Sequence, residues 1–388
     1  MSIKILHINF SDSGGAAIAS MYLHEELLRQ GVESKYLCLN LTKKHPPHLH
    51  YYSHRRIYKT FIRKLWHLYL KGYLINKKYE HLHRLIPHPN DAITIPYSPF
   101  DLTLDPLYQE ADIIHLHWPS RFLNWPTFFR KNRKPIVWTL HDRNPFSGIL
   151  HCATNFPQEG MRLEEKIKKK KKKWLANANI YVVGPSELYT SLSQQSDVLG
   201  MFPHTTIYHG IPDQIFHPMD KIACRIKLNL PVDQKIILSV ASDLKRKLKG
   251  FEELLRFAAQ QPELLFAFIG KKDPLAPELS NVRYAGEIKD QKELNEWYNA
   301  ADLTISNSAE ESFGLTIAES LMAGTPIASR ETGFIRNKIY NLIKFNELNE
   351  VKDLILVDTK TNLDLRKFQL SSCYTNYASV YFQLINKL

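Results

Sequence analysis

Residues Asn307–Pro326, which read NSAEESFGLTIAESLMAGTP, decide the fold of this 388-residue chain. The apolar run Ala301–Ile305 before them predicts a buried strand, and Gly314 predicts a tight turn. A short helix is expected after the turn, ending at Ala323-Gly324, and Pro326–Ala328 begins another strand. The order of strand, glycine turn, helix and strand is typical of a parallel α/β sheet.

Two carboxylates, Glu311 and Glu319, lie on either side of this turn. The N-terminus of a helix attracts phosphate, and a glycine at 314 lets a phosphate approach the backbone closely. Glu319, inside the helix, is placed to accept hydrogen bonds from a ribose diol, and Glu311, on the loop, is placed to hold sugar hydroxyls. The alternative interpretation is a solvated loop glutamate and a glutamate on the surface of a helix.

The same alternation of strand and helix runs along most of the chain and predicts parallel sheets covered by helices on both faces. Strands are expected at 4–10, 34–39, 113–118, 136–140, 180–183, 236–240, 264–269 and 302–306, and helices at 16–30, 251–259 and 294–300. Because the pattern breaks near 185–212 and then restarts, we expect two Rossmann-like domains, at 1–190 and 205–367. Ligands of such folds bind at the carboxyl ends of the strands, so we expect a cleft between the domains.

Composition limits the function classes. The chain is 44% hydrophobic and carries a formal net charge of +12, which favours an anionic partner. Nucleic acid is not expected, because no base-stacking module or recognition helix is evident. The 4 cysteines include no Cys-x-x-Cys pair, the N-terminus has no signal-peptide pattern, and no apolar run is long enough to span a bilayer. We therefore expect a cytoplasmic protein.

Two basic segments interrupt the alternation. The segment 54–84 mixes Arg, Lys and aromatic residues at helical spacing, which predicts a basic amphipathic helix pair. It either docks on an anionic membrane surface, as a peripheral protein of the inner face would, or packs on its domain with a solvated basic face. The lysine run within 166–173 is expected to form a solvated helix face, with a phosphate or lipid role as the alternative.

Three further motifs fall at the ends of predicted strands. The loop around Gly14 and Gly15 opens a helix but lacks the GxGxxG spacing of a dinucleotide site, so it suits a phosphate or a sugar better than a nicotinamide or flavin cofactor. His141 and Asp142 follow a strand, where His141 is able to donate to a sugar hydroxyl or phosphate. Lys249 stands at a helix start, where it is able to neutralise a diphosphate.

A metal centre is not expected. His115 and His117 alternate on one strand and therefore share a face, but the sequence shows no third ligand beside them.

Together these residues resemble the retaining glycosyltransferases of the GT-B fold, in the group known as family four. The resemblance is carried by Glu-x7-Glu at 311–319 followed by Gly-Thr-Pro, and it extends over most of the chain. Its other matching motifs are Gly14-Gly15, Thr139–Asp142, Val182–Ser186, Tyr208–Pro212 with Phe216 and Pro218, and Lys249–Phe251.

The resemblance implies a metal-independent transfer of a sugar from a nucleotide diphosphate sugar to an acceptor hydroxyl, with retention of configuration and no other cofactor. It implies that Glu319 binds the ribose, Glu311 holds the sugar and Lys249 neutralises the leaving diphosphate. The implied donor contacts are the amides of Phe313, Gly314 and Leu315, with Arg246, and from the first domain His141, Gly14 and Gly15, with Asp142 on the acceptor side. It also implies that 368–388 forms a helix that crosses back to the first domain.

The chain departs from the family pattern at three places. Members often carry an arginine six residues before the lysine, where this chain has Asp243, although Arg246 or Lys247 is close enough in sequence to substitute. His209 replaces the usual asparagine before Gly210, and the segment 332–336 replaces the usual Gly-Gly-Ile-Pro-Glu.

The expected function is therefore a glycosyltransferase acting on a glycan or lipid-linked acceptor, in the synthesis of a surface polysaccharide such as lipopolysaccharide O-antigen. Two alternatives remain. A nucleotide-sugar 2-epimerase would use the same donor site without an acceptor. A non-catalytic sugar-nucleotide-binding scaffold is favoured by Asp243 and disfavoured by Glu311, Glu319 and Lys249.

Overall fold

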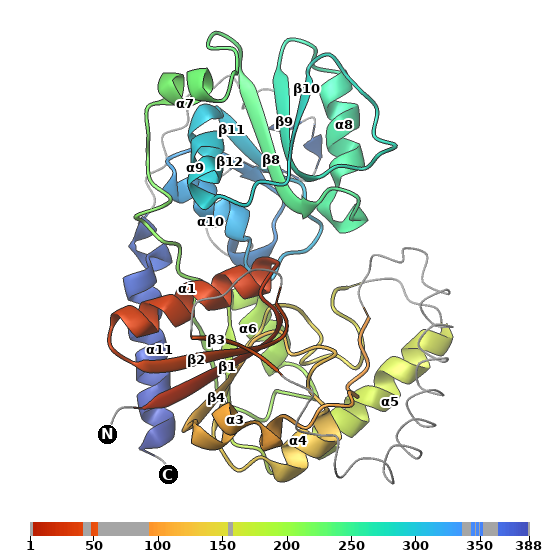
Figure 1. Ribbon diagram of the computed structural model, residues 1–388. Helices are drawn as coiled ribbons and strands as arrows, with labels where there is room; N and C mark the ends of the chain where they lie inside the picture. Colours follow the sequence, from red (N-terminus) through yellow and green to blue (C-terminus); the bar gives the residue numbers. More distant parts are fainter. Residues whose placement is uncertain are drawn as a thin grey trace. The chain divides into compact units, whose positions relative to one another are not determined.

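The structure is a computed structural model in which the chain forms two compact units (Figure 1). Unit 1 comprises Met1–Pro185, Tyr189–Ile207 and Tyr374–Leu388, and unit 2 comprises Ser186–Leu188 and Tyr208–Cys373. The structure describes residues 3–41, 48–52, 93–153, 158–335, 343–345, 347–348, 350–351 and 364–386. The basic segment 54–84 lies outside the described residues.

Unit 1 is built on a seven-stranded parallel sheet with the strand order β3-β2-β1-β4-β5-β6-β7. Its strands are β1 Lys4–Ser11, β2 Glu33–Asn40, β3 Leu49–Tyr51, β4 Ile113–Leu116, β5 Ile136–Thr139, β6 Ile180–Gly184 and β7 His204–Thr206. The α-helices are α1 Gly15–Arg29, α3 Pro106–Glu110, α4 Trp125–Lys131, α5 Gln158–Leu175, α6 Glu187–Gln194, which begins in unit 2, and α11 Leu370–Ile385.

The C-terminal helix α11 belongs to unit 1 from Tyr374 onward. Its Tyr377 and Tyr381 hydroxyls bond to Thr139 of β5 and His115 of β4, at 2.7 Å each. These bonds join the last helix of the chain to the central strands of the first sheet.

Unit 2 repeats the plan with a six-stranded parallel sheet, ordered β10-β9-β8-β11-β12-β13. Its strands are β8 Ile236–Asp243, β9 Leu265–Lys271, β10 Val282–Gly286, β11 Leu303–Ser306, β12 Ile327–Ser329 and β13 Ile343–Lys344, and its α-helices are α7 Lys221–Lys227, α8 Phe251–Ala259, α9 Gln291–Ala300 and α10 Leu315–Met322.

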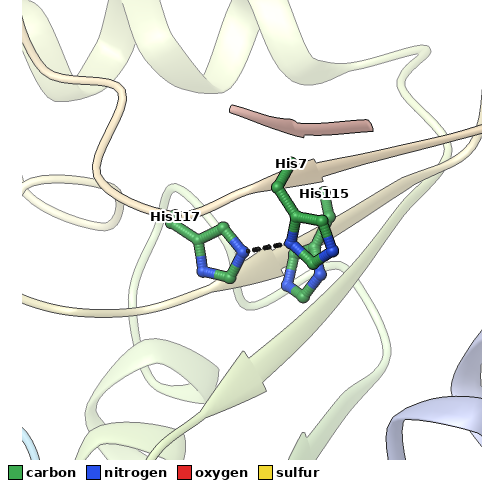
Figure 2. A group of neighbouring side chains, drawn as sticks. All are labelled: His7, His115 and His117. Atoms are coloured by element: carbon green, nitrogen blue, oxygen red, sulfur yellow. Dashed lines mark hydrogen bonds between the residues drawn. The ribbon is translucent and has the colours of Figure 1, made fainter. Parts of the chain in front are cut away.

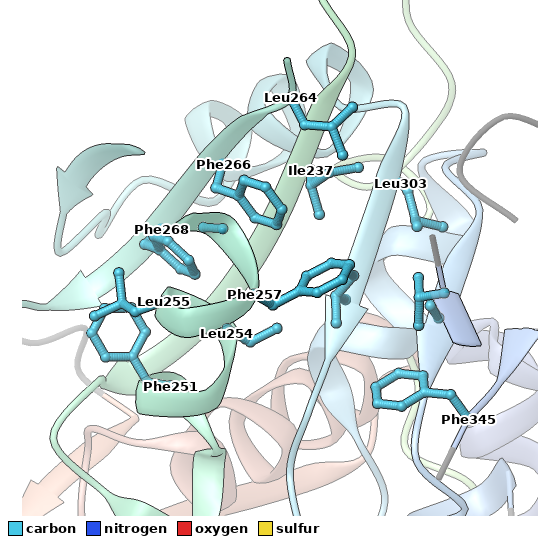
Figure 3. Packing of buried hydrophobic residues seen from close by; sticks show 14 of the residues in the cluster. Ile237, Phe251, Leu254, Leu255, Phe257, Leu264, Phe266, Phe268, Leu303 and Phe345 are labelled. Atoms are coloured by element: carbon cyan, nitrogen blue, oxygen red, sulfur yellow. The ribbon is translucent and has the colours of Figure 1, made fainter. Parts of the chain in front are cut away.

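The core of unit 2 is rich in phenylalanine and lies between α8 and the sheet (Figure 3). Phe251, Leu254 and Phe257 of α8 pack over Phe266 and Phe268 of β9. The three residues of α8 are three positions apart and therefore lie on one face of the helix. Phe266 and Phe268 are two positions apart and therefore lie on one face of the strand. The two periodicities place both sets in the same core.

The predicted fold class is confirmed, because the chain forms two parallel α/β sheets. Apart from the helix pair at 54–84, which lies outside the described residues, each strand and helix predicted in the sequence analysis has a counterpart within a few residues. The edge strands β3, β7, β10 and β13 were not predicted, since they are short and lack a long apolar run. Within the described ranges, no helix combines the length and apolar composition that crossing a membrane requires.

Candidate functional site

Lys249 and Glu311 form an ion pair in unit 2. Lys249 follows β8 and Glu311 follows β11, and these two strands are parallel neighbours, so their carboxyl-end loops lie side by side. Lys249 Nζ lies 2.5 Å from Glu311 Oε1, and about a fifth of each side chain is exposed. Two residues that the sequence analysis placed in one site, 62 positions apart, are therefore brought together.

The N-terminus of α10 begins directly after this loop. Gly314 precedes the helix at φ 101°, a left-handed conformation that favours glycine, and no side chain among the described residues caps it. The amide groups from Leu315 onward therefore open a helix whose dipole favours an anion. Phe313 is buried, with its ring 5.0 Å from those of Phe334 and His209, and this packing fixes the turn.

Glu319 lies in the fifth position of α10 and is almost completely buried. Its Oε2 accepts a hydrogen bond of 2.9 Å from the hydroxyl of Tyr298 on α9. Burial raises the pKa of Glu319 from 4.5 to about 7, and the Tyr298 bond opposes that rise. The carboxyl therefore changes charge near neutral pH.

Three loops at this edge of the sheet are tied together by residues that the sequence analysis did not single out. Asn307 Nδ2 donates to the carbonyl of Gly250 at 2.9 Å, and Arg330 Nε donates to Asn307 Oδ1 at 2.7 Å. Arg330 also donates to Glu253 at 2.8 Å. Arg330 directly follows β12, and this position at the carboxyl end of a strand is the signal by which the sequence could have revealed it.

Asp243, six residues before Lys249, is used within its own loop. Its Oδ1 accepts the backbone N–H of Lys245 at 3.0 Å, and its carbonyl accepts that of Arg246 at 3.4 Å. Asp243 therefore shapes the turn before Lys249, and Arg246 is a half-buried residue of that turn.

In unit 1, Asp142 holds the loop that follows β5. Its carboxylate accepts the N–H of Asn144 at 2.8 Å and contacts Trp118 Nε1 and His151 Nδ1. His141 is half-buried beside it, and Gly14 and Gly15 are exposed at the start of α1.

The same loop rests on two buried charged residues of α5. Glu164 accepts the backbone N–H groups of Gly148 and Ile149 at 2.6 Å, and Lys171 Nζ donates to the carbonyls of Asn144 and Ser147 at 2.5 and 3.0 Å. Lys171 belongs to the lysine run expected to form a solvated face. That expectation is wrong for this residue, because position 171 falls on the inward stripe of α5.

Burial lowers the pKa of Lys171 to about 7, although the carboxylates of Glu164 and Asp142 oppose this change. The ammonium also lies 4.3 Å above the ring of Trp125. The carbonyl acceptors and the aromatic face compensate in part for the loss of water around the amine.

We predict that Glu164→Ala destabilises unit 1 by about 2 to 3 kcal/mol, because buried backbone N–H groups lose their acceptor. The neighbouring Glu165→Ala is the matched control, since Glu165 is exposed and pairs only with Lys168 across the described contacts. Denaturant unfolding of both variants checks the difference. Equal stabilities would contradict the role of Glu164 in holding the loop.

Histidine side chains cluster on the face of the first sheet beneath α1 and α11. His7 of β1 lies beside His115 of β4, and both are fully buried together with His117 (Figure 2). Their ring nitrogens lie within 4.8 Å of one another, an arrangement that can hold a metal ion. The third imidazole that the sequence analysis did not find is therefore His7, on the neighbouring strand.

The nitrogens of this cluster already have hydrogen-bonding partners at most positions. His115 bonds to Tyr381 and Thr139, and His117 bonds to His7 and His141. Burial lowers the pKa of His7 to about 3 and that of His115 well below its usual value, so both rings are neutral.

Comparison with known proteins finds a family match within unit 2. Residues 220–342 match the model of the family Glycosyl transferases group 1. The D-inositol 3-phosphate glycosyltransferase of Thermobispora bispora is 29% identical over 254 residues, covering 59% of this chain and 56% of that protein. The enzyme of the same name from Mycolicibacterium smegmatis is 26% identical over 240 residues, covering 57% and 52%. The chain thus spans little more than half the length of these curated relatives.

Solved structures extend the likeness of fold over the whole chain. Sucrose-phosphate synthase from Thermosynechococcus elongatus aligns with a TM-score of 0.69 at 19% identity, covering 100% of both chains. Anabaena HepE in complex with UDP and glucose aligns with a TM-score of 0.66 at 15% identity, covering 98% of this chain and 99% of that one. The fold of the chain is therefore GT-B.

Proposed function

We propose that the protein is a glycosyltransferase that moves a sugar from a nucleotide diphosphate sugar to an acceptor hydroxyl. The observation that carries the proposal is the meeting of Lys249 and Glu311 beside the glycine turn that opens α10. A cation, a carboxylate and a helix N-terminus at one sheet edge provide what a diphosphate sugar needs. The match of residues 220–342 to the group 1 family supports the same reading.

In this proposal each charged residue has a defined task. The diphosphate competes with Glu311 for Lys249, and the amides at the start of α10 share the phosphate charge. Glu311, once released from Lys249, accepts hydrogen bonds from the sugar hydroxyls. The carboxylate of Glu319, in its ionised form, accepts hydrogen bonds from the ribose hydroxyls. We propose that the sugar also contacts His141, Gly14 and Gly15. Arg246 is proposed to contact the diphosphate. Asp142 is proposed to orient the loop on the acceptor side.

We further propose that the reaction proceeds with retention and without a metal ion. The bond between sugar C1 and the phosphate oxygen breaks, and the acceptor oxygen bonds to C1 on the same face of the ring. The acceptor proton passes to the departing phosphate. Lys249 and the α10 amides stabilise the charge that develops on that phosphate, the role a metal ion has in other transferases.

We propose partners from the names of the relatives and from the net charge of the chain. HepE is recorded with UDP and with UDP-glucose, so we propose a uridine nucleotide as the first donor to test. For the acceptor we propose a glycan or lipid-linked glycan of a surface polymer. A phosphorylated polyol is the second candidate, because the curated relatives are named inositol 3-phosphate glycosyltransferases and the chain carries a net charge of +12. Docking on a membrane through 54–84 stays a prediction.

The test is ¹H NMR of nucleotide sugars incubated with the enzyme, alone and with acceptor candidates, in the presence of a chelator. The proposal expects a new glycosidic anomeric signal of the donor's configuration only when an acceptor is present. Conversion of the donor to an epimer without acceptor would favour the epimerase instead. Nucleotide binding without any turnover across the acceptor panel would favour the scaffold.

A further inference from the structure

Three imidazoles of unit 1 form a continuous hydrogen-bonded chain. His7 Nδ1 lies 2.8 Å from His117 Nε2, and His117 Nδ1 lies 3.2 Å from His141 Nε2. The chain leads from the buried strand β1, through the residue just after β4, to the loop that follows β5. Figure 2 shows its first link, between His7 and His117. It therefore connects the interior of the sheet to the histidine that we propose contacts the sugar.

This connectivity couples the protonation of the three rings. A neutral imidazole has one N–H donor and one acceptor nitrogen, and each hydrogen bond in the chain holds one hydrogen. Because every link joins an Nδ1 to an Nε2, neutral rings satisfy both bonds only when all three carry hydrogen on the same atom. The chain is therefore either entirely Nδ1–H or entirely Nε2–H.

The surroundings of His7 select between these two states. His7 Nε2 is buried and has no hydrogen-bond partner among the described residues. Its ring is surrounded by the rings of His24, Tyr36 and His115 at centroid distances of 5.4, 6.0 and 4.9 Å. In the Nε2–H state this position would be a buried donor without an acceptor, and buried N–H groups without partners are rarer than under-satisfied acceptors. The Nδ1–H state leaves only an unprotonated nitrogen there.

We propose that His7 and His117 are positioning residues that hold His141 as its Nδ1–H tautomer. His141 Nε2 then accepts from His117, and Nδ1 carries the hydrogen. Resting on the proposed function, this means that His141 serves the sugar or phosphate as a hydrogen-bond donor at Nδ1 and does not act as a base there. The acceptor proton must then go elsewhere, which agrees with its transfer to the leaving phosphate.

Metal binding is the competing use of the same atoms. An ion held by His7, His115 and His117 would need lone pairs of His115 and His117 that hydrogen bonds now occupy, whereas His7 Nε2 makes no such bond to the described residues. The two states are exclusive, so one experiment separates them.

The experiment is long-range ¹H–¹⁵N NMR of the full chain labelled with ¹⁵N-histidine, which reports directly which ring nitrogen carries the hydrogen. We expect His7, His117 and His141 all as Nδ1–H at neutral pH. In His117→Phe, which keeps a ring in the core but removes both bonds, the Nε2–H form of His141 should appear. His24→Phe is the matched control, because it removes a buried imidazole beside His7 that lies outside the chain.

Wild-type His141 as Nε2–H, or an unchanged His141 in a folded His117→Phe variant, would overturn the proposal. If His117→Phe does not fold, His7→Phe tests the coupling from the far end of the chain and predicts the same change at His141. Stoichiometric Co²⁺ binding that shifts the signals of His7, His115 and His117 together would also overturn it. None of these measurements needs a donor or acceptor, so their failure is distinct from failure of the proposed glycosyl transfer.

Discussion

Lys249→Ala is expected to lower the rate of sugar transfer by about 10² to 10³-fold, the usual effect of removing one group that stabilises developing charge. The affinity for a nucleoside diphosphate should fall by about 10- to 100-fold, because a charge-assisted hydrogen bond is lost. The affinity for the nucleoside alone should not change, since Lys249 is proposed to meet only the phosphates. Calorimetric titrations with both ligands check this difference.

Lys247→Ala is the matched control for that prediction. Lys247 lies two residues away in the same short helical turn, has the same charge and is exposed. Loss of long-range electrostatic attraction would affect both variants alike, whereas loss of a direct contact affects only Lys249. Equal effects of the two substitutions on diphosphate affinity would contradict the assigned contact.

Glu319→Gln is expected to stabilise the protein at pH 8 and to weaken nucleotide binding. Burial raises the pKa of Glu319 to about 7 in the folded chain, whereas 4.5 is its ordinary value. Between these values the folded chain binds more protons than the unfolded chain, so this carboxyl contributes stability at low pH that is lost as the pH rises. Holding the ionised carboxylate of Glu319 in the folded chain therefore costs about 3 kcal/mol at high pH. An uncharged glutamine does not carry this cost.

The expected measurement is a gain of about 1 to 3 kcal/mol in the free energy of unfolding at pH 8 for Glu319→Gln, which shrinks as the pH falls and vanishes below 4.5. Nucleotide affinity of the wild type should rise as the pH increases through 7, because the ribose hydroxyls need an ionised acceptor, and the variant should bind weakly at every pH. Tyr298→Phe removes the bond that lowers the pKa of Glu319 and should move the rise in affinity to higher pH.

Glu296→Gln serves as the control for this pair, because Glu296 is also a buried glutamate but is paired with Lys227. It should not become more stable at pH 8. A wild-type nucleotide affinity that does not vary between pH 6 and 8 would contradict the role of Glu319.

The sequence was most informative where function depends on backbone pattern. The run Ala301–Pro326 predicts β11, the turn and α10, because strand hydrophobicity, a glycine and a helix stop are all local signals. Parallel strands also align their carboxyl ends, so the meeting of Lys249 and Glu311 follows from two local predictions. These features need no knowledge of side-chain packing.

What the sequence did not reveal depends on which side chains are buried. Lys171 is one of six consecutive lysines, and only the pitch of α5 directs it into the core. In the sequence, His7 is one residue of an apolar strand. Only the pairing of β1 with β4 places it beside His115. Tyr298 joins Glu319 across two helices. Such contacts are tertiary, and a single sequence without its fold contains no local signal for them.

The measurement that tests the central claim most directly is a thermal-shift screen with UDP, GDP, ADP and CMP and their sugars, with magnesium and with chelator. A ligand at a hundred times its dissociation constant adds about 2.7 kcal/mol to the free energy of unfolding. The account predicts stabilisation by one nucleotide class, unaffected by chelator and lost in Glu319→Gln at pH 8. No stabilisation by any nucleotide, or the same stabilisation in Glu319→Gln, would contradict the donor site in unit 2.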